Sequence, residues 1–224
     1  MGSYVPERIA DDKITFFGGF MDSQNIKAVI FDMGGVFVQT IDKEPRTHLA
    51  CRFGLSYEEL SNIVFQSDSA QLATVGQIDE RVHWEFIAHY FKLSESEMIN
   101  FWEEFWGGDQ LDQQLVDFTQ SIKDKYQVAL LSNAWSGARA LLTKKFNFLH
   151  LFDISVFSAE VKMAKPAPEF FEWMIKKLDI NVNQSVFVDD FIENIIAARS
   201  LGMKTVHFKT TNRAIGELKS LLGM

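Results

Sequence analysis

The sequence predicts an α/β fold in which a doubly wound parallel sheet is interrupted by an inserted block of helices. Two observations lead to this prediction. From residue 126 to the C-terminus, short apolar runs alternate with longer helical stretches, which is typical of a parallel sheet covered by helices on both faces. Before that point, residues 41–110 break the alternation and show helical patterns alone.

The first expected strand is residues 26–31, with the sequence IKAVIF, and it ends in Asp32. Its continuous apolar and β-branched character is that of a strand buried on both faces. Four later segments have the same character: residues 128–131, 154–157, 185–188 and 204–208. The expected helices between and after them are residues 136–146, 167–178, 191–201 and 212–222. This order predicts a Rossmann-like core.

The inserted block carries several signals that start helices. Ser56 with Glu59 and Ser94 with Glu97 have the spacing of capping boxes, and Asp79 is a further expected N-cap. Two sets of apolar residues there have helical spacing, and we expect the aromatic ones to lie in the core of the block: Val82, Phe86, Ile87 and Tyr90, then Phe101, Trp102, Phe105 and Trp106. The expected division is a leader or extension at 1–20, an α/β core at 21–40 and 111–224, and a helical domain at 41–110.

Composition narrows the class of protein. The chain has 224 residues, a formal net charge of −8 and a pI near 5.1, so its surface repels phosphate backbones and nucleic acid is not an expected partner. No apolar run is long enough to cross a bilayer, and the N-terminal residues lack the basic-then-apolar order of a secretory signal. The single cysteine, Cys51, excludes an internal disulfide, and we expect it to be buried in a helix. These features predict a cytoplasmic protein; they do not fix its oligomeric state.

Polar residues follow three of the expected strands where each ends. Asp32 follows the first, Ser132 and Asn133 close the second, and the pair Asp189–Asp190 closes the fourth, with Asn194 shortly after; Lys165 precedes Pro166. Alone, each of these is more often a turn, a cap or a solvated surface residue. Because ligands bind beyond the carboxyl ends of the strands in open α/β sheets, their order along the chain predicts one shared site.

The residue types at this edge indicate a particular chemistry. Asp32 and the Asp189–Asp190 pair are hard oxygen ligands without histidine or cysteine nearby in the sequence, which favours magnesium. Lys165 adds a positive charge. Ser132, the Asn133 amide and the Gly34 and Gly35 amides add hydrogen-bond donors. A carboxylate beside such an anion clamp is the arrangement that phosphoryl transfer through a covalent aspartyl intermediate requires.

Four segments, taken together, resemble the four ordered motifs of the haloacid dehalogenase superfamily: IKAVIFDMGGVFVQT, VALLSNAW, AEVKMAKPAPEFFEWMIKKL and SVFVDDFIENIIAARSLGMKTVHF. The resemblance extends from Ile26 almost to the C-terminus, although the helical block matches in position and character alone. Asn133-Ala-Trp135 and the run from Asp189 to Asn194 are most similar to the phosphatase-like N-terminal domain of soluble epoxide hydrolases and to bacterial sugar-phosphate phosphatases.

This resemblance implies a role for each residue. Asp32 would attack phosphorus, Ser132 and Asn133 would bind phosphoryl oxygens, and Lys165 would bridge Asp32 and the phosphate. The implied magnesium site comprises Asp32, the Gly34 carbonyl, Asp190 and Asp189, with Asp189 and Asn194 acting mainly in support of the others. The inserted helices would form a cap that closes over the site. The expected substrate is a small phosphorylated metabolite, with sugar phosphates among the candidates.

One position departs from the family pattern. Phosphatases of this superfamily usually carry a second aspartate two residues after the nucleophile as general acid and base, and here that residue is Gly34. Three interpretations follow: a substrate with a good leaving group, a substitute acid such as His48 or His83, or a catalytically weak relative that binds phospho-ligands. Dehalogenases of the superfamily also lack that aspartate, but they need no metal. Because Asp189 and Asp190 are retained, phosphatase activity is predicted ahead of dehalogenation.

Overall fold

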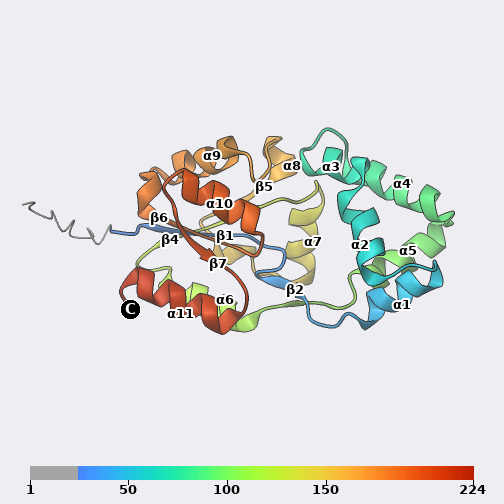
Figure 1. Cartoon of the computed structure of the whole chain (residues 1–224), viewed down its shortest axis with the longest axis horizontal. Helices are drawn as coiled ribbons and strands as arrows, with labels where there is room; N and C mark the ends of the chain where they lie inside the picture. The colour runs from blue at the N-terminus through green and yellow to red at the C-terminus, as the bar shows by residue number, and fades with distance from the viewer. Residues whose placement is uncertain (1–24) are drawn as a thin grey trace, which may run out of the picture.

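The computed structural model describes residues 25–224, and within this range five parallel strands form a sheet in the order β5-β4-β1-β6-β7 (Figure 1). The central strand β1 pairs with β4 on one side, Ala28 opposite Gln127, and with β6 on the other, Ala28 opposite Ser185. The strands are β1 (Ala28–Phe31), β4 (Gln127–Ser132), β5 (Ile154–Phe157), β6 (Ser185–Asp189) and β7 (Lys204–His207). The predicted α/β fold class is therefore confirmed.

Helices cover both faces of the sheet because successive residues of β1 point to opposite sides. Val29 and Phe31 join a core cluster with side chains of α6 and α11, whereas Ala28 and Ile30 join a second cluster with α9 and α10. The helices of this part are α6 (Gln113–Ile122), α7 (Ala138–Lys145), α8 (Ser158–Val161), α9 (Pro168–Leu178), α10 (Ile192–Ser200) and α11 (Thr211–Leu222), with short 3₁₀ turns η1 (Leu149–Leu151) and η2 (Val182–Gln184).

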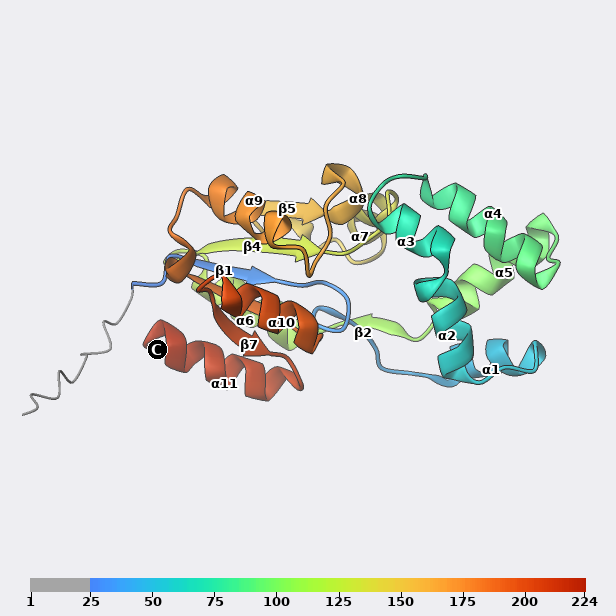
Figure 2. The same cartoon turned by 45° about the horizontal axis from the view of Figure 1, so that its top comes forward.

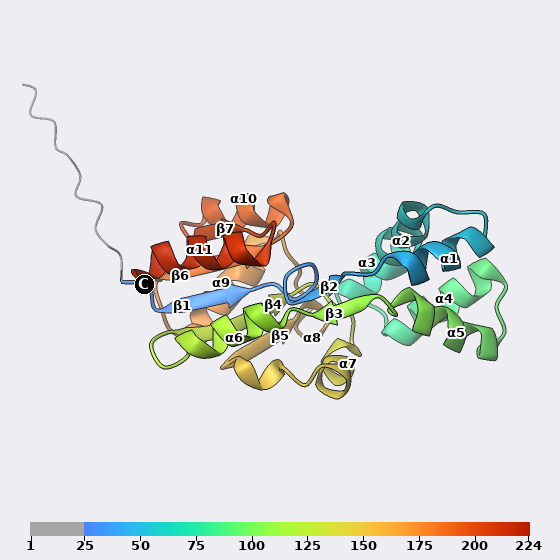
Figure 3. The same ribbon diagram turned by 90° about the horizontal axis from the view of Figure 1, so that it is seen from below.

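A group of helices lies beyond the carboxyl ends of the strands, at the end of the molecule away from the C-terminus (Figures 1 and 2). It is joined to the sheet through a two-stranded antiparallel ribbon of β2 and β3, which Figure 3 shows from below. Its own core includes Leu49, Leu60, Ile87, Phe101 and Phe105. The elements are β2 (Val38–Thr40), α1 (Glu44–Arg52), α2 (Tyr57–Gln66), α3 (Asp68–Thr74), α4 (Glu80–Phe91), α5 (Glu95–Phe105) and β3 (Asp109–Leu111).

The helix caps expected in this inserted group are present in the structure. Both capping boxes form, with Ser56 and Glu59 bonding reciprocally at the start of α2 and Ser94 and Glu97 at the start of α5. Asp79 caps α4 by accepting from the Arg81 N–H.

Two expectations about burial were wrong. Cys51 is exposed, because α1 turns Leu49 and Ala50 inward instead. Val82, Phe86 and Tyr90 are exposed, because α4 buries the face that carries His83 and Ile87. The stripe on α5 divides in the same way, with Phe101 and Phe105 buried and Trp102 and Trp106 half-buried.

The predicted leader at residues 1–20 lies outside the described residues. None of the helices formed by residues 25–224 combines the length and the apolar character that a membrane crossing requires.

Candidate active site

Asp32 occupies the carboxyl end of the central strand. The strand before it is fully buried, and the Asp32 N–H continues the pairing with β6 by donating to the Val188 carbonyl at 2.8 Å. This pairing places Asp32 beside the end of β6, where Asp189 and Asp190 follow. A single apolar strand therefore holds one carboxylate against two others in the crevice where open α/β sheets bind ligands.

Lys165 lies between two of these carboxylates. Its Nζ is 2.8 Å from Asp32 Oδ1 and 2.7 Å from Asp189 Oδ2, and its side chain is only 1% exposed. Burial alone would lower the pKa of this ammonium, but the two carboxylates raise the pKa above its usual value. Lys165 therefore stays charged inside the protein.

Asn133 fixes the backbone from which Lys165 extends. Its side-chain Nδ2 donates to the Lys165 carbonyl and its Oδ1 accepts from the Lys165 N–H, both at 2.8 Å. The two bonds use both ends of the amide side chain. What Asn133 can still offer to a ligand is its backbone N–H and the second N–H of its side-chain amide.

Asp189 is fully buried and both of its oxygens are occupied. Oδ1 accepts from the Phe191 N–H at 2.8 Å, and Asn194 Nδ2 lies 3.1 Å from Oδ1 and 3.0 Å from Oδ2. With Lys165 on Oδ2 as well, the carboxylate is surrounded by donors. This geometry orients Lys165 and leaves Asp189 little capacity for a further ligand.

Asp190 differs from its neighbour. Its Oδ1 is buried and has no hydrogen-bond partner among the residues that the structure describes. Burial, followed by repulsion from Asp32 and Asp189, raises the pKa of Asp190 to about 7. The pKa of Asp32 is also raised, because burial outweighs the attraction of Lys165. The single ammonium of Lys165 thus does not offset the burial and mutual repulsion of these carboxylates.

These oxygens suit a divalent cation. Asp32, Asp189 and Asp190 each have an oxygen within 4.8 Å of the others, and because Asp189 is already bonded to donors, Asp32 and Asp190 have the greater capacity for a cation. A hard cation bound there would satisfy the unpartnered Asp190 oxygen and reduce the repulsion, and carboxylate oxygens are the ligands that magnesium prefers. The residues present therefore fit a magnesium ion.

A family model for haloacid dehalogenase-like hydrolases matches residues 26–202, which is most of the chain and includes Asp32, Asn133, Lys165, Asp189 and Asp190. The chain belongs to this family.

Three relatives agree with the branch predicted from the motifs. A sesquiterpene phosphatase of Aspergillus oryzae is 27% identical over 201 residues, 88% of this chain and 97% of that protein. A D-ribitol-5-phosphate phosphatase of Bacteroides thetaiotaomicron is 25% identical over 200 residues, 80% of this chain and 90% of that protein.

Bifunctional epoxide hydrolase 2 of Rattus norvegicus is 29% identical over 118 residues, 50% of this chain but only 21% of that much longer protein. Among solved structures, a haloacid dehalogenase family enzyme of Bacteroides thetaiotaomicron in complex with magnesium superposes with a TM-score of 0.68 at 25% identity. That match covers 84% of this chain and 95% of the other. The resemblance to this family and branch, predicted from the sequence, is confirmed.

In this haloacid dehalogenase-like hydrolase, the other predicted residues have defined places. Ser132 is buried at the end of β4, opposite Phe157 of β5. The Gly35 N–H donates to the Val38 carbonyl at 2.9 Å, so the expectation that it serves as a free donor for an anion was wrong. His48 has a side chain that is 71% exposed and lies 3.7 Å from Glu44, whereas His83 is buried against Trp84 and Trp135.

Sequence reasoning missed one residue of the site in the hydrolase, His207, and missed one contact of Gly35. His207 Nε2 lies 3.0 Å from the Asp190 carbonyl oxygen, and its place at the end of β7 could have suggested that contact. Gly35 has a φ of +73°, and a Cβ there would lie 2.2 Å from Asp190 Oδ2. Glycine at this position thus allows the backbone to pass close to the Asp190 carboxylate.

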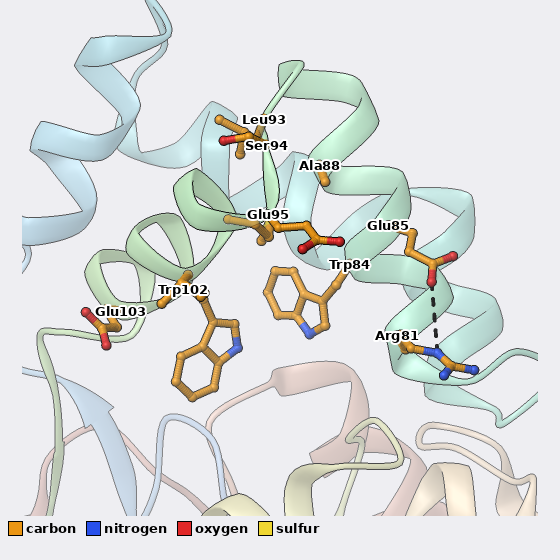
Figure 4. A pocket seen from close by; sticks show the side chains of 11 residues that line it. Arg81, Trp84, Glu85, Ala88, Leu93, Ser94, Glu95, Trp102 and Glu103 are labelled. Atoms are coloured by element: carbon orange, nitrogen blue, oxygen red, sulfur yellow. Dashed lines mark ion pairs between the residues drawn. The ribbon is translucent and has the colours of Figure 1, made fainter.

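A surface groove of about 540 Å³ lies apart from these carboxylates, between α4 and α5 of the hydrolase (Figure 4). The rings of Trp84 and Trp102 project into it, with Glu85, Glu95 and Glu103 at its edges. None of the carboxylates at the strand ends lines it. The groove therefore gives no support for assigning the chemistry to the inserted helices.

Proposed function

We propose that the protein is a magnesium-dependent phosphatase that hydrolyses a small phosphorylated metabolite through an aspartyl-phosphate intermediate on Asp32. The observation that carries the proposal is that Asp32 is paired with a buried ammonium and lies close to Asp190, which has an unpartnered carboxylate oxygen. Phosphoryl transfer needs a nucleophile, a fixed positive charge such as an ammonium, and a free carboxylate oxygen that can bind a metal ion.

Each residue has a role in this proposal. Asp32 attacks phosphorus, and Lys165 reduces the repulsion between the Asp32 carboxylate and the phosphate. Ser132 and the Asn133 backbone amide bind phosphoryl oxygens. Asp32, the Gly34 carbonyl and Asp190 hold magnesium, while Asp189 and Asn194 hold Lys165 and the loop in place. Magnesium supplies charge neutralisation for the phosphoryl oxygens.

The inserted region 41–110 acts as the cap in this proposal, and 21–40 with 111–224 is the catalytic core. A helical cap over the carboxyl ends of the strands excludes water and selects the substrate. The phosphatase relatives support a phosphate ester; one is named for a sesquiterpene and the other for a sugar-alcohol phosphate. We also propose a cytoplasmic location, which the single cysteine supports.

The alternatives are a dehalogenase and a weak phospho-ligand-binding relative. The carboxylates that suit a cation argue against the first, because attack on carbon needs no metal. The glycine at position 34 is the observation that favours the second.

The test is a screen of phosphorylated metabolites with magnesium, repeated with EDTA, together with calorimetric titration of magnesium. We expect turnover of at least one phosphate ester that EDTA abolishes, and a large loss of magnesium affinity in Asp190→Asn. The matched control is Asp179→Asn, an exposed residue whose left-handed backbone suits asparagine. Dehalogenation that persists in EDTA would establish the first alternative, and binding of phosphate esters without turnover would establish the second.

A further inference from the structure

The loop that follows β4 is attached to the inserted helices by a tryptophan. Trp135 Nε1 donates to Thr74 Oγ1 at 3.1 Å and lies 3.2 Å from the Ala70 carbonyl oxygen, both on α3. Its ring packs 4.6 Å from the His83 ring and 5.4 Å from the Trp84 ring, measured between centroids. A side chain from the α/β part of the protein thus packs against the hydrophobic core of the inserted helices.

A buried hydroxyl strengthens the same junction. Ser158 Oγ donates to the Thr74 carbonyl at 2.6 Å and accepts from the Ala134 N–H at 2.9 Å. Because Ser158 is fully buried, neither bond can be replaced by water without rearrangement. One hydroxyl therefore connects α3, the loop after β4 and the start of α8. We call Thr74, Ala134, Trp135 and Ser158 the seam.

The seam is continuous with the reactive groups. Asn133 is the neighbour of Ala134, and its side chain bonds both the N–H and the carbonyl of Lys165. Lys165 Nζ in turn lies between Asp32 and Asp189. An unbroken series of hydrogen bonds and backbone links thus runs from α3 to the ammonium beside Asp32.

We propose that Trp135 and Ser158 are positioning residues through which the inserted helices set the place of Asn133 and, by way of it, Lys165. The position of the ammonium then depends on the docking of α3, and not on the core alone. The kinetic consequence rests on the proposed function, but the structural coupling does not. Spatial continuity alone does not prove coupling, so the test must perturb one end and measure the other.

Thr74 provides the sharpest perturbation because it lies on α3, outside the loop. Thr74→Val keeps the shape but removes the nearer of the two acceptors for Trp135, leaving the Ala70 carbonyl, whereas Thr74→Ser keeps that acceptor and removes a methyl group. Trp135→Phe removes the donor from the other side. The matched control is Thr143→Val on α7, whose hydroxyl bonds the Arg139 carbonyl on the surface.

The reporter is amide hydrogen exchange at Lys165, whose N–H donates to Asn133 Oδ1. We expect exchange there to accelerate about threefold to tenfold in Thr74→Val and Trp135→Phe, the range that loss of one hydrogen bond gives. Thr74→Ser should stay near the parent, and so should Thr143→Val. Unchanged exchange at Lys165 in both Thr74→Val and Trp135→Phe, with native circular dichroism, would overturn the proposal. A defect in Thr74→Ser but not Thr74→Val would show that Thr74 only packs, and would overturn it too.

The kinetic measurement uses para-nitrophenyl phosphate with magnesium. We expect kcat to fall about threefold to tenfold in Thr74→Val and Trp135→Phe while KM changes less than about twofold, since the seam acts through Lys165. If the parent hydrolyses no phosphate ester, the proposed function fails and the exchange measurement still decides the coupling. If exchange changes while kcat does not, the seam moves the Lys165 backbone without positioning its ammonium, and the proposal is wrong.

Discussion

Gly34 and Gly35 lie two and three residues after Asp32, and the structure has room for a side chain at Gly34 but not at Gly35. At Gly35 the positive φ and the contact with Asp190 exclude a side chain. At Gly34 the backbone lies outside the left-handed region, and no described atom lies within 4 Å of the place that a Cβ would take. The position where phosphatases of this family usually carry an acid is therefore open to a larger residue.

Gly34→Asp should accordingly fold and gain rate on esters with poor leaving groups. A leaving alkoxide needs a proton that glycine cannot supply, and general acid catalysis contributes on the order of 10²–10⁴ in rate. The measurement is kcat/KM across esters of graded leaving-group pKa. We expect a steep dependence in the parent and a flatter one in the variant.

The comparison variant for that series is Gly35→Ala, which should weaken magnesium binding and destabilise the fold by about 1–3 kcal/mol. A flat series in the parent would show that another group already donates the proton. His83 is then a poor candidate because it is buried against two tryptophans, and the exposed His48 would be replaced first.

Asp32→Asn should lower turnover by about three orders of magnitude or more and leave circular dichroism unchanged. The amide matches the carboxylate in shape but is a very poor nucleophile. Asp179→Asn serves again as the control for the substitution itself. Turnover at the parent rate in Asp32→Asn would remove Asp32 from the role we propose.

The types and order of the candidate site residues could be predicted from the sequence, because all of them except Lys165 lie at or just after the end of a recognisable strand. Their individual tasks could not. Asp189 and Asp190 are adjacent and chemically identical, yet one is saturated with donors and the other is left with an unpartnered oxygen. That difference arises because donors of Lys165, Asn194 and Phe191 reach Asp189. The fold of the backbone brings these donors to Asp189, and the sequence alone does not show it.

At the scale of elements, apolar runs predicted the five strands of the sheet, whereas in the inserted helices the capping patterns predicted more than the apolar stripes. The capping boxes of α2 and α5 form as expected because their partners lie three residues apart. The stripe through Val82, Phe86 and Tyr90 was misleading because tertiary packing selected the face of His83 and Ile87. The strands β2 and β3 have three residues each, too few for any period to appear.

His83 makes the stability of α4 and its neighbours sensitive to acid. Burial lowers the pKa of the folded imidazole from 6.5 to about 4, so between these values the unfolded chain binds more protons than the folded one. The free energy of unfolding should therefore fall as pH drops from 6.5 to 4, by about 2–3 kcal/mol from this residue. When the free energy of unfolding from urea denaturation is plotted against pH over this range, the slope should be smaller for His83→Gln than for the parent. Equal slopes for the two proteins would show that His83 does not titrate as its burial implies.

At the scale of the whole molecule, the inserted helices and the ribbon are linked by Arg46. This buried guanidinium donates to the Phe105 carbonyl at 2.9 Å and to the Tyr57 hydroxyl at 3.0 Å, and lies 3.5 Å from Asp109 of β3. The Thr40 hydroxyl of β2 donates to the same carboxylate at 2.6 Å. The positive charge of Arg46 on α1 is thus paired with the Asp109 carboxylate of the ribbon that connects the inserted helices to the sheet.

Arg46→Leu should lower the free energy of unfolding by about 3 kcal/mol, because it leaves the Asp109 carboxylate without its buried cation. Arg52→Leu is the matched control: its pair with Glu104 is exposed, and we expect a loss below about 1 kcal/mol. Urea denaturation of both variants measures the contrast. Equal losses would show that the Arg46 pair contributes no more than a surface pair.

The central place of β1 in the sheet also sets an order of events during synthesis. Both of its neighbours come much later in the chain, β4 after the inserted helices and β6 after α9. After synthesis, β1 therefore has no partner until Gln127–Ser132 of β4 have been made, and it lacks its second partner until Ser185–Asp189 of β6 follow, so its fully apolar sequence stays exposed meanwhile. The inserted helices have a core of their own from residues 49–105, and they can collapse during that interval. We therefore expect a nascent chain to form its helical part before its sheet, with β1 as the segment that a chaperone would need to shield.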